Sequence, residues 1–482
     1  MALSSSNTRI VASAAPASRA EALALRVPAS ADVLEIRLDA FLEPPDLPAL
    51  RAAFAGRTLL ATLRSAREGG SFTGGPEEAG AVLSAALAAG FDLVDVELVV
   101  ARGRRLLGLP PERVVVSVHD LSEAPDLEGW ARELAAARAA FSKLVTRAAN
   151  ETEARAVLDL QERHGRQLTA FAMGEFGIVS RVLSPFLGAP LAFGSIGPPT
   201  APGQLSAVDL REIYGVGTDR RVEQLFALFG GRVSHSFSPA LHNARFRSLE
   251  LPYLYVPCAV KELPKAPRIG GLPLAGASVT VPFKEDAARL APCEETALNT
   301  LLWNGRSVRG VNTDRVPFET FLQPAEPGRI ALVLGTGGTA RTAIAVLKAR
   351  GYDVKVASRD PERAAAFAYE TGVEATGNAV FRVDVLVNAT PLGLSASDPL
   401  PCDASLVTAG MTVVDAPYLA GGTALTRLAR SRGARLLDGF AFLVSQAAAQ
   451  STLFTGVATA PGDLLAALPE RIRAIFTEVS AS

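Results

Sequence analysis

The first 210 residues alternate short apolar segments with Ala/Leu-rich stretches, such as 75–90 and 126–140, whose apolar residues recur at helical spacing. Eight apolar segments have the length and pattern of buried strands: 9–15, 33–39, 58–64, 91–98, 113–120, 141–148, 167–174 and 191–197. Repeated strand–helix units predict an α/β fold with an N-terminal (β/α)8 barrel over residues 1–218. An open doubly wound sheet is the alternative that the pattern leaves.

The alternation stops near residues 215–221, and a different organisation follows. Residues 222–325 read as a smaller α/β unit with strands at 253–260 and 276–283. A strand at 329–335 then runs into a glycine turn and a helix, and apolar segments continue the pattern at 352–359, 383–390, 411–418 and 434–439. Residues 326–438 are therefore predicted to form a Rossmann dinucleotide-binding sheet. Residues 439–482 are predicted to be helices that pack back on the 222–325 unit.

Composition and charge narrow the function classes. Apolar residues make up 49% of the chain and charged residues 20%, which excludes a disordered protein. The net charge is −1 with no basic stripe, so we expect no nucleic-acid partner, and no apolar run is long enough to suggest a membrane span. The three cysteines are scattered without metal-ligand spacing, which predicts reduced thiols, no metal and a cytoplasmic location. The Ser/Ala-rich start leaves a targeting segment as an alternative, and the oligomeric state stays open.

Lysine usage is the most informative part of the composition. Only six of the 48 basic residues are lysine, and Lys143 is the single lysine in the first 260 residues. Arginine stays protonated, whereas a desolvated lysine can lose its proton and attack a carbonyl carbon. The isolated Lys143 thus suggests a task that arginine cannot perform, although chance in an arginine-rich chain gives the same count.

Charged residues gather near the carboxyl ends of the predicted barrel strands, where barrels carry their chemistry: Arg37, Arg64, His119 and Lys143. A lysine inside a barrel strand needs a charged or polar partner, or it loses its proton and becomes neutral. The neutral amine is the form that forms a Schiff base with a ketone. His119 ends the preceding strand and can act as a general acid and base. Several arginines in one mouth indicate an anionic substrate. The structural alternatives are that His119 belongs to an ordinary turn at the end of its strand and that the arginines belong to a solvated rim.

These residues stand in the motifs EIRLD, TLRSAREGG, SVHD, FSKLVT, FAMGEFGIVSRVL, AFGSI and APGQL. The set resembles type I 3-dehydroquinate dehydratase across residues 9–210. The resemblance implies that Lys143 forms an imine with 3-dehydroquinate, that His119 transfers the proton and that Glu68 orients His119. It also implies that Arg181 binds the substrate carboxylate. The expected hydroxyl and ring contacts are Glu35, Arg37, Arg64, Ser195 and Gln204.

The sequence GTGGTA follows a strand and opens a helix, which is the setting of a pyrophosphate-binding turn. The next strand ends in Ser358-Arg359-Asp360, and Arg363 follows within a helical turn. Arginine at this place favours the 2′-phosphate of NADP, whereas an acidic residue favours NAD. We therefore predict NADP, with NAD the less favoured alternative because of Asp360.

The motifs SHSFSP, SVTVPFKE, ALNTL, GVNTD, NATPLG, DAPY and GFAFLVSQ together resemble shikimate dehydrogenase over residues 225–476. The resemblance implies a catalytic pair of Lys284 and Asp314, for which a salt bridge at a domain junction is the alternative. The expected contacts to 3-dehydroshikimate or shikimate are Ser236, Ser238, Thr280, Asn299, Tyr418 and Gln446. The expected cofactor contacts are Gly335, Gly337, Gly338, Thr339, Ser358, Arg359, Arg363, Asn388, Thr390 and Gly439.

The chain departs from the second family at Ser278, Pro317, Leu394 and Phe442, and it shortens the stretch between Lys284 and Asn299. Taken together, the two halves resemble consecutive enzymes, in which the product of the first is the substrate of the second. The alternatives are a catalytically silent sensor of quinate or shikimate and a C-terminal half that prefers quinate. Retention of Lys143, His119, Lys284 and Asp314 favours the enzyme.

Overall fold

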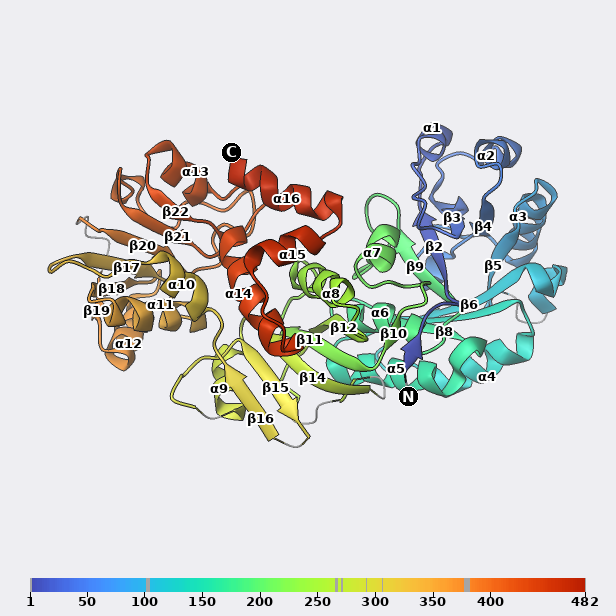
Figure 1. The fold of residues 1–482 in the computed structure, drawn as a ribbon. Helices are drawn as coiled ribbons and strands as arrows, with labels where there is room; N and C mark the ends of the chain where they lie inside the picture. The colour runs from blue at the N-terminus through green and yellow to red at the C-terminus, as the bar shows by residue number, and fades with distance from the viewer. Residues whose placement is uncertain are drawn as a thin grey trace.

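A computed structural model of the chain describes residues 2–100, 105–264, 268–269, 272–291, 293–305, 307–376 and 382–481. Its N-terminal part is the predicted eight-stranded parallel barrel, at the right of Figure 1. The strands are β2 (Arg9–Ala14), β3 (Val33–Arg37), β4 (Thr58–Thr62), β5 (Leu93–Glu97), β6 (Val114–Asp120), β7 (Phe141–Arg147), β8 (Thr169–Met173) and β9 (Leu191–Ser195). The alternative of an open doubly wound sheet is wrong, because β2 pairs with both β3 and β9 and brings the last strand beside the first.

The helices of the barrel are α1 (Arg19–Leu23), α2 (Leu47–Ala53), α3 (Pro76–Ala88), α4 (Leu127–Ala137), α5 (Glu151–His164), α6 (Ile178–Phe186) and α7 (Ala207–Glu212). Side chains that point inward, such as Val11, Leu60 and Val115, form one buried cluster inside the barrel. Between β8 and β9 the Thr169 hydroxyl accepts a hydrogen bond from the Leu191 N–H at 3.2 Å. A side chain therefore contributes to closing the barrel at this seam.

The middle unit contains a mixed sheet in the order β12-β11-β14-β15-β16. Its elements are β11 (Gln224–Gly230), α8 (Ser238–Ser248), β12 (Tyr253–Ala259), β14 (Leu272–Val279), α9 (Lys284–Leu290), β15 (Thr300–Asn304), β16 (Ser307–Val311) and α10 (Arg315–Phe321), with the short β13 (Arg268–Ile269) beside β14. β11 runs parallel to β12 and β14, whereas β15 and β16 are antiparallel additions. Both strands predicted here are present, and the structure adds β11, the short β13 and the antiparallel pair of β15 and β16.

The third unit is a parallel sheet in the order β19-β18-β17-β20-β21-β22, at the left of Figure 1. Its elements are β17 (Ile330–Leu334), α11 (Gly338–Ala349), β18 (Asp353–Ala357), α12 (Pro361–Thr371), β19 (Glu374–Ala375), β20 (Val385–Asn388), β21 (Thr412–Asp415), α13 (Ala424–Ser431) and β22 (Arg435–Leu437). The strand order reverses between β17 and β20, and ligands bind at such switch points in open parallel sheets. The glycine turn that follows β17 lies there.

The chain ends in α14 (Gly439–Thr455), α15 (Pro461–Ala467) and α16 (Glu470–Ala481), which cross the centre of Figure 1. α14 and α15 pack against α8, where Leu241 and Ala244 join Phe440 and Ala447 in one apolar cluster. None of the helices that the structure describes has the length and hydropathy to span a membrane.

The barrel and the middle unit are in direct contact. β1 (Leu3–Ser4) pairs with β10 (Arg221–Val222), and α6 packs against β12 as well as against β8 and β9. All nine residues of α6 are buried, because barrel strands cover one side of this helix and the middle unit covers another. Arg471 of α16 also forms ion pairs with α7, at 2.6 Å from Asp209 and 2.7 Å from Glu212.

Candidate active sites

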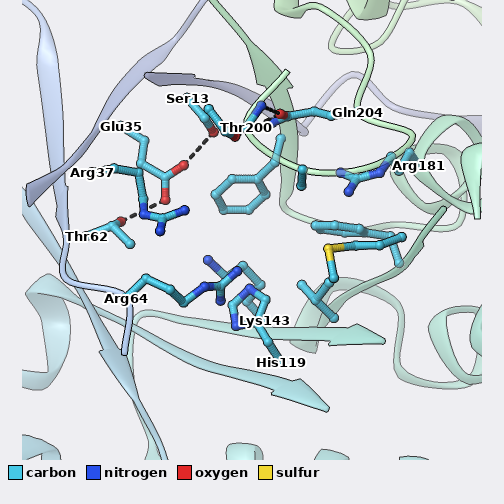
Figure 2. A pocket seen from close by; sticks show the side chains of 15 residues that line it. Ser13, Glu35, Arg37, Thr62, Arg64, His119, Lys143, Arg181, Thr200 and Gln204 are labelled. Atoms are coloured by element: carbon cyan, nitrogen blue, oxygen red, sulfur yellow. Dashed lines mark hydrogen bonds between the residues drawn. The ribbon is translucent and has the colours of Figure 1, made fainter. Parts of the chain in front are cut away.

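Lys143 lies in the middle of β7 and points into the mouth of the barrel, where it lines a pocket (Figure 2). Its side chain is 4% exposed, and Nζ donates to Asp95 Oδ2 at 2.5 Å. The ammonium also lies 4.5 Å from the centre of the Phe193 ring. A carboxylate and an aromatic face thus compensate for the burial of this charge.

Asp95 was not among the residues predicted from the sequence. It stands on β5 two residues before Glu97, so both side chains point to the inside of the barrel. Its second oxygen accepts from the Ser117 hydroxyl at 2.5 Å. Two carboxylates at alternate positions in an otherwise apolar strand are the signal that could have identified them.

His119 follows on β6, one strand away from Lys143, and contacts Glu68. Nδ1 lies 2.9 Å from Glu68 Oε2, and the same oxygen accepts the His119 backbone N–H at 2.9 Å. The ring is therefore fixed through Nδ1, which leaves Nε2 for a ligand in the pocket. Burial, and then the nearby Glu97 carboxylate, raises the pKa of Glu68 to about 8.

Arg181 approaches the pocket from the side opposite to Glu35 and Arg37 (Figure 2). Burial lowers the pKa of Arg181 to about 9, so the guanidinium keeps its charge at neutral pH. It stacks on Phe171 at 4.5 Å, and within the described residues its Nε has no hydrogen-bond partner. A desolvated cation without a carboxylate partner is a site for an anionic group of a ligand.

The other predicted barrel residues surround the same pocket, apart from Ser195. Glu35 accepts from Thr62 at 2.7 Å and from Ser13, and Arg37 forms a two-pronged ion pair with Asp39 at 2.6 and 2.7 Å. Burial is the main effect that lowers the pKa of the Arg64 guanidinium. On the loop after β9, Gln204 Oε1 accepts from the Thr200 backbone N–H at 2.7 Å. Ser195 is buried at the end of β9 and does not line the pocket.

Lys284 and Asp314 also meet, although 30 residues separate them. Lys284 begins α9, Asp314 precedes α10, and Nζ donates to Asp314 Oδ2. Nζ donates in addition to the Thr339 hydroxyl at 2.9 Å, so the lysine links the middle unit to the start of α11. Both ionic side chains are nearly buried.

Asn299 and Gln446 extend this polar group. Asn299 Nδ2 donates to Asp314 Oδ1 at 2.8 Å and to Gln446 Oε1 at 3.2 Å. Of the remaining predicted substrate contacts, Ser238 begins α8, whereas the others lie outside helices and strands: Ser236, Thr280 and Tyr418. The Tyr418 hydroxyl interacts with Ser236, and burial raises the pKa of the tyrosine.

The turn between β17 and α11 requires glycine at two of its positions. Gly335 has φ +110°, and a Cβ there would lie 2.8 Å from the Ala389 carbonyl oxygen. At Gly338 a Cβ would lie 2.9 Å from Lys284 Cβ. Gly337, by contrast, has open space on its Cβ side, so a ligand can approach its backbone. This arrangement fits a dinucleotide pyrophosphate at the start of α11.

Arg359 and Asp360, which follow β18, differ in their contacts. The Asp360 carboxylate caps α12 by accepting the backbone N–H groups of Glu362 and Arg363, each at 3.1 Å. Arg359 and Arg363 are exposed, and neither has an ion-pair partner in the part of the chain that the structure describes. Ser358 accepts the Asp360 N–H at 3.3 Å. Two available guanidinium groups fit the 2′-phosphate of NADP.

Three predicted cofactor residues have contacts within the protein. Asn388 is fully buried, donates to Asp415 at 2.8 Å, and accepts from the Thr390 hydroxyl at 2.7 Å. These bonds hold the loop after β20. Gly439 starts α14 directly against Pro417, whose carbonyl oxygen a Cβ would approach to 2.1 Å.

The departures from the second family also have local explanations. Ser278 donates to Gln450 at 2.8 Å in a buried contact, and Pro317 is buried in α10. The Phe442 ring packs edge-on against Phe318 at 5.1 Å, inside the core of the third unit. Leu394 is 56% exposed and contributes little to that core.

Family models match three segments of the chain. A model described as type I 3-dehydroquinase matches residues 10–219. The shikimate dehydrogenase substrate binding domain matches residues 228–300, and a model described as NADP oxidoreductase, coenzyme F420-dependent, matches residues 329–396.

Two relatives that are similar in sequence, from Arabidopsis thaliana and Rubrobacter xylanophilus, support the same division. A chloroplastic bifunctional 3-dehydroquinate dehydratase/shikimate dehydrogenase of Arabidopsis thaliana is 30% identical over 486 residues, covering 90% of this chain and 79% of the relative. A shikimate dehydrogenase (NADP(+)) of Rubrobacter xylanophilus is 38% identical over 48% of this chain and 91% of its own length. A dehydroquinate dehydratase and shikimate dehydrogenase structure from S. pombe covers 98% of both chains at 23% identity, with a TM-score of 0.42. Because this chain matches the Arabidopsis protein over 90% of its own length and 79% of the relative's length, it belongs to the family of bifunctional 3-dehydroquinate dehydratase/shikimate dehydrogenases.

Proposed function

We propose that the barrel dehydrates 3-dehydroquinate to 3-dehydroshikimate and that the C-terminal half reduces this product to shikimate with NADPH. The observation that carries the proposal is the presence of two separate lysine–aspartate pairs, the buried pair Lys143–Asp95 and the largely buried pair Lys284–Asp314. Each lies among the motifs of one of the two families. A silent sensor would not need either pair, so the geometry favours the enzyme.

In the barrel, the Lys143 amine attacks the ring ketone, and loss of water gives an imine. The imine draws electrons from the neighbouring C–H bond, and His119 Nε2 takes that proton. His119 then protonates the departing hydroxyl, which leaves as water. Hydrolysis of the imine returns Lys143, so the substrate loses one water overall.

The surrounding charges support these steps. Asp95 accepts a hydrogen bond from the Lys143 ammonium and can take its proton before the attack. Glu68 fixes His119 through Nδ1, which keeps Nε2 directed at the substrate. Arg181 provides an unpaired positive charge for the substrate carboxylate.

In the C-terminal half, Lys284 and Asp314 hold and move the proton of the reacting oxygen. Asn299 and Thr339 fix this pair through hydrogen bonds at 2.8 and 2.9 Å. NADPH supplies the hydride when it is bound at the turn after β17. Arg359 and Arg363 would hold its 2′-phosphate, and Gly337 would allow the pyrophosphate to approach. We place the protein in the cytoplasm, for which its free cysteines Cys258, Cys293 and Cys402 are suited.

The decisive experiment on the barrel is to trap the imine. Borohydride reduction in the presence of 3-dehydroquinate is expected to attach the substrate to Lys143, as read by mass spectrometry of peptides. Lys143→Arg is expected to abolish dehydration while leaving NADP-dependent oxidation of shikimate intact. A label on another residue, or dehydration by the arginine variant, would contradict the assignment.

The cofactor assignment has its own test. Recognition of a phosphate by a charged guanidinium is worth about 1.5–3 kcal/mol, or about a 10–150-fold change in affinity. Arg359→Ala is therefore expected to raise KM for NADP by about that factor and to change KM for NAD little. Equal or better kcat/KM of the wild type with NAD would reject the preference for NADP.

A further inference from the structure

A carboxylate of the barrel reaches into the loop that precedes α8 in the middle unit. Glu175 lies between β8 and α6, and its Oε1 accepts the backbone N–H groups of Val233 and Ser234, the latter at 2.9 Å. Backbone N–H groups of a surface loop ordinarily bond to water or to groups of their own unit. Here one charged oxygen from the other enzyme half fixes two of them.

A short series of hydrogen bonds connects this contact with the two serines of the SHSFSP motif. The Val233 carbonyl accepts the Ser236 N–H at 3.2 Å, and the Ser236 hydroxyl accepts the Ser238 N–H at 3.2 Å. Val233 is also buried, so the turn is held from its side chain as well as from its backbone. The position of Glu175 therefore constrains the backbone of the turn that carries both serines.

The Glu175 segment also contacts the barrel pocket. Gly174 donates its backbone N–H to the Pro202 carbonyl at 3.1 Å, and Met173 lines the pocket. A Cβ at Gly203 would lie 2.4 Å from the Gly174 carbonyl oxygen, so the two segments pack closely. Glu175 thus belongs to the barrel by its backbone and supports the C-terminal half by its side chain.

We propose that Glu175 is a positioning residue for the shikimate site of the C-terminal half. This inference rests on the proposed function, because it takes Ser236 and Ser238 as contacts of shikimate. The barrel then supplies part of the support for the second active site. Shikimate affinity, rather than the chemical step, depends on this carboxylate, since Glu175 touches neither Lys284 nor Asp314.

Glu151 offers a matched control elsewhere on the same boundary. It also belongs to the barrel, and its carboxylate accepts the backbone N–H groups of Lys261 and Glu262 at 3.1 and 3.3 Å. These residues follow β12 and do not lead into the serine motif. Removal of Glu151 therefore loosens the boundary in the same way without moving Ser236 or Ser238.

The test compares Glu175→Ala, Glu175→Gln and Glu151→Ala in the full chain. For Glu175→Ala we expect KM for shikimate to rise at least tenfold, with kcat reduced less than threefold and KM for NADP unchanged. Glu175→Gln keeps one carbonyl oxygen as acceptor, so its KM is expected to fall between those of Glu175→Ala and the wild type. Glu151→Ala is expected to stay within twofold of the wild type.

Hydrogen–deuterium exchange gives a readout that does not depend on activity. We expect peptides covering residues 231–238 to exchange faster in Glu175→Ala and at the wild-type rate in Glu151→Ala. An unchanged KM for shikimate in Glu175→Ala, or an equal rise in Glu151→Ala, would overturn the role of Glu175 alone. A wild-type protein that neither oxidises nor binds shikimate would overturn the proposed function together with it.

Discussion

Several charged side chains are buried at the pocket of the barrel. Lys143 faces a carboxylate and an aromatic ring, and His119 faces Glu68, whereas Arg181 has no anionic partner among the described residues. Leaving a charge unpaired in a buried place costs folding free energy. The cost at Arg181 is consistent with a ligand that supplies the missing anion.

Glu68 makes the stability of the protein depend on pH. Its folded pKa of about 8 lies above the ordinary value of 4.5, so the folded state binds this proton more tightly than the unfolded state. The resulting stabilisation is complete below about pH 4.5 and is lost as pH rises toward 8, by up to about 1.4 kcal/mol per pH unit. Glu68→Gln removes this titration, so its melting temperature relative to the wild type is expected to be higher at pH 8.5 than at pH 5.5.

Glu112→Gln, which changes an exposed carboxylate of the same barrel, serves as the control and should leave the pH dependence as it is. Melting temperatures of the three proteins at both pH values give the measurement. Identical pH dependence in the wild type and Glu68→Gln would mean that Glu68 titrates normally in the folded protein.

At the scale of the elements, the start of α11 leaves space on one side and packs against a side chain on the other. Gly337 leaves open space, whereas Gly338 lies against the side chain of Lys284. We expect Gly338→Ala to displace Lys284 and to lower kcat for shikimate oxidation at least tenfold. Gly337→Ala is expected to act on KM for NADP, because the added methyl group occupies only the space that a cofactor would use. Steady-state kinetics of both variants distinguish the two effects, and an unchanged kcat in Gly338→Ala would contradict this packing argument.

Strands and helices could be predicted because buried apolar residues recur along them at a regular spacing. Every barrel strand expected from the apolar pattern is present, and β17 runs into its glycine turn as predicted. β11, β15 and β16 were missed. β16 is a five-residue edge strand without a buried residue, so its apolar signal is short and weak. Local pattern carries little information about such a strand.

Individual partners were harder to predict than elements. Lys143 and His119 stood out by residue type. Asp95 was missed because it pairs with Lys143 from β5, two strands away in the barrel and 48 positions away in the sequence. Two interpretations of Asp360 were possible, and they differ in the direction of its side chain. In the structure this carboxylate caps α12. Contacts of this kind are set by tertiary packing, which one sequence does not reveal.

At the scale of the whole molecule, the two enzyme halves share a boundary with a buried helix. α6 is apolar over most of its surface, and β12 of the middle unit covers one of its sides. A fragment of residues 1–218 would expose that side to water, and burial contributes about 25 cal/mol per Å² of apolar surface.

We expect this fragment to melt at a lower temperature than the barrel within the full chain and to bind the hydrophobic dye ANS. Loss of dehydratase activity on heating gives the comparison, since it reports the barrel in both proteins. If the fragment is inactivated at the same temperature as the full chain and does not bind the dye, the contact of α6 with β12 does not stabilise the barrel.

The covered face of α6 has a consequence for how the protein is made. Synthesis proceeds from the N-terminus, so all eight barrel strands leave the ribosome before β12 does. During that interval a folded barrel presents the α6 face to solvent, and exposed apolar surface of this kind promotes aggregation. Slow translation between residues 196 and 252 would prolong this stage. The yield of folded protein should therefore respond to chaperones that shield this face until the second half of the chain has emerged.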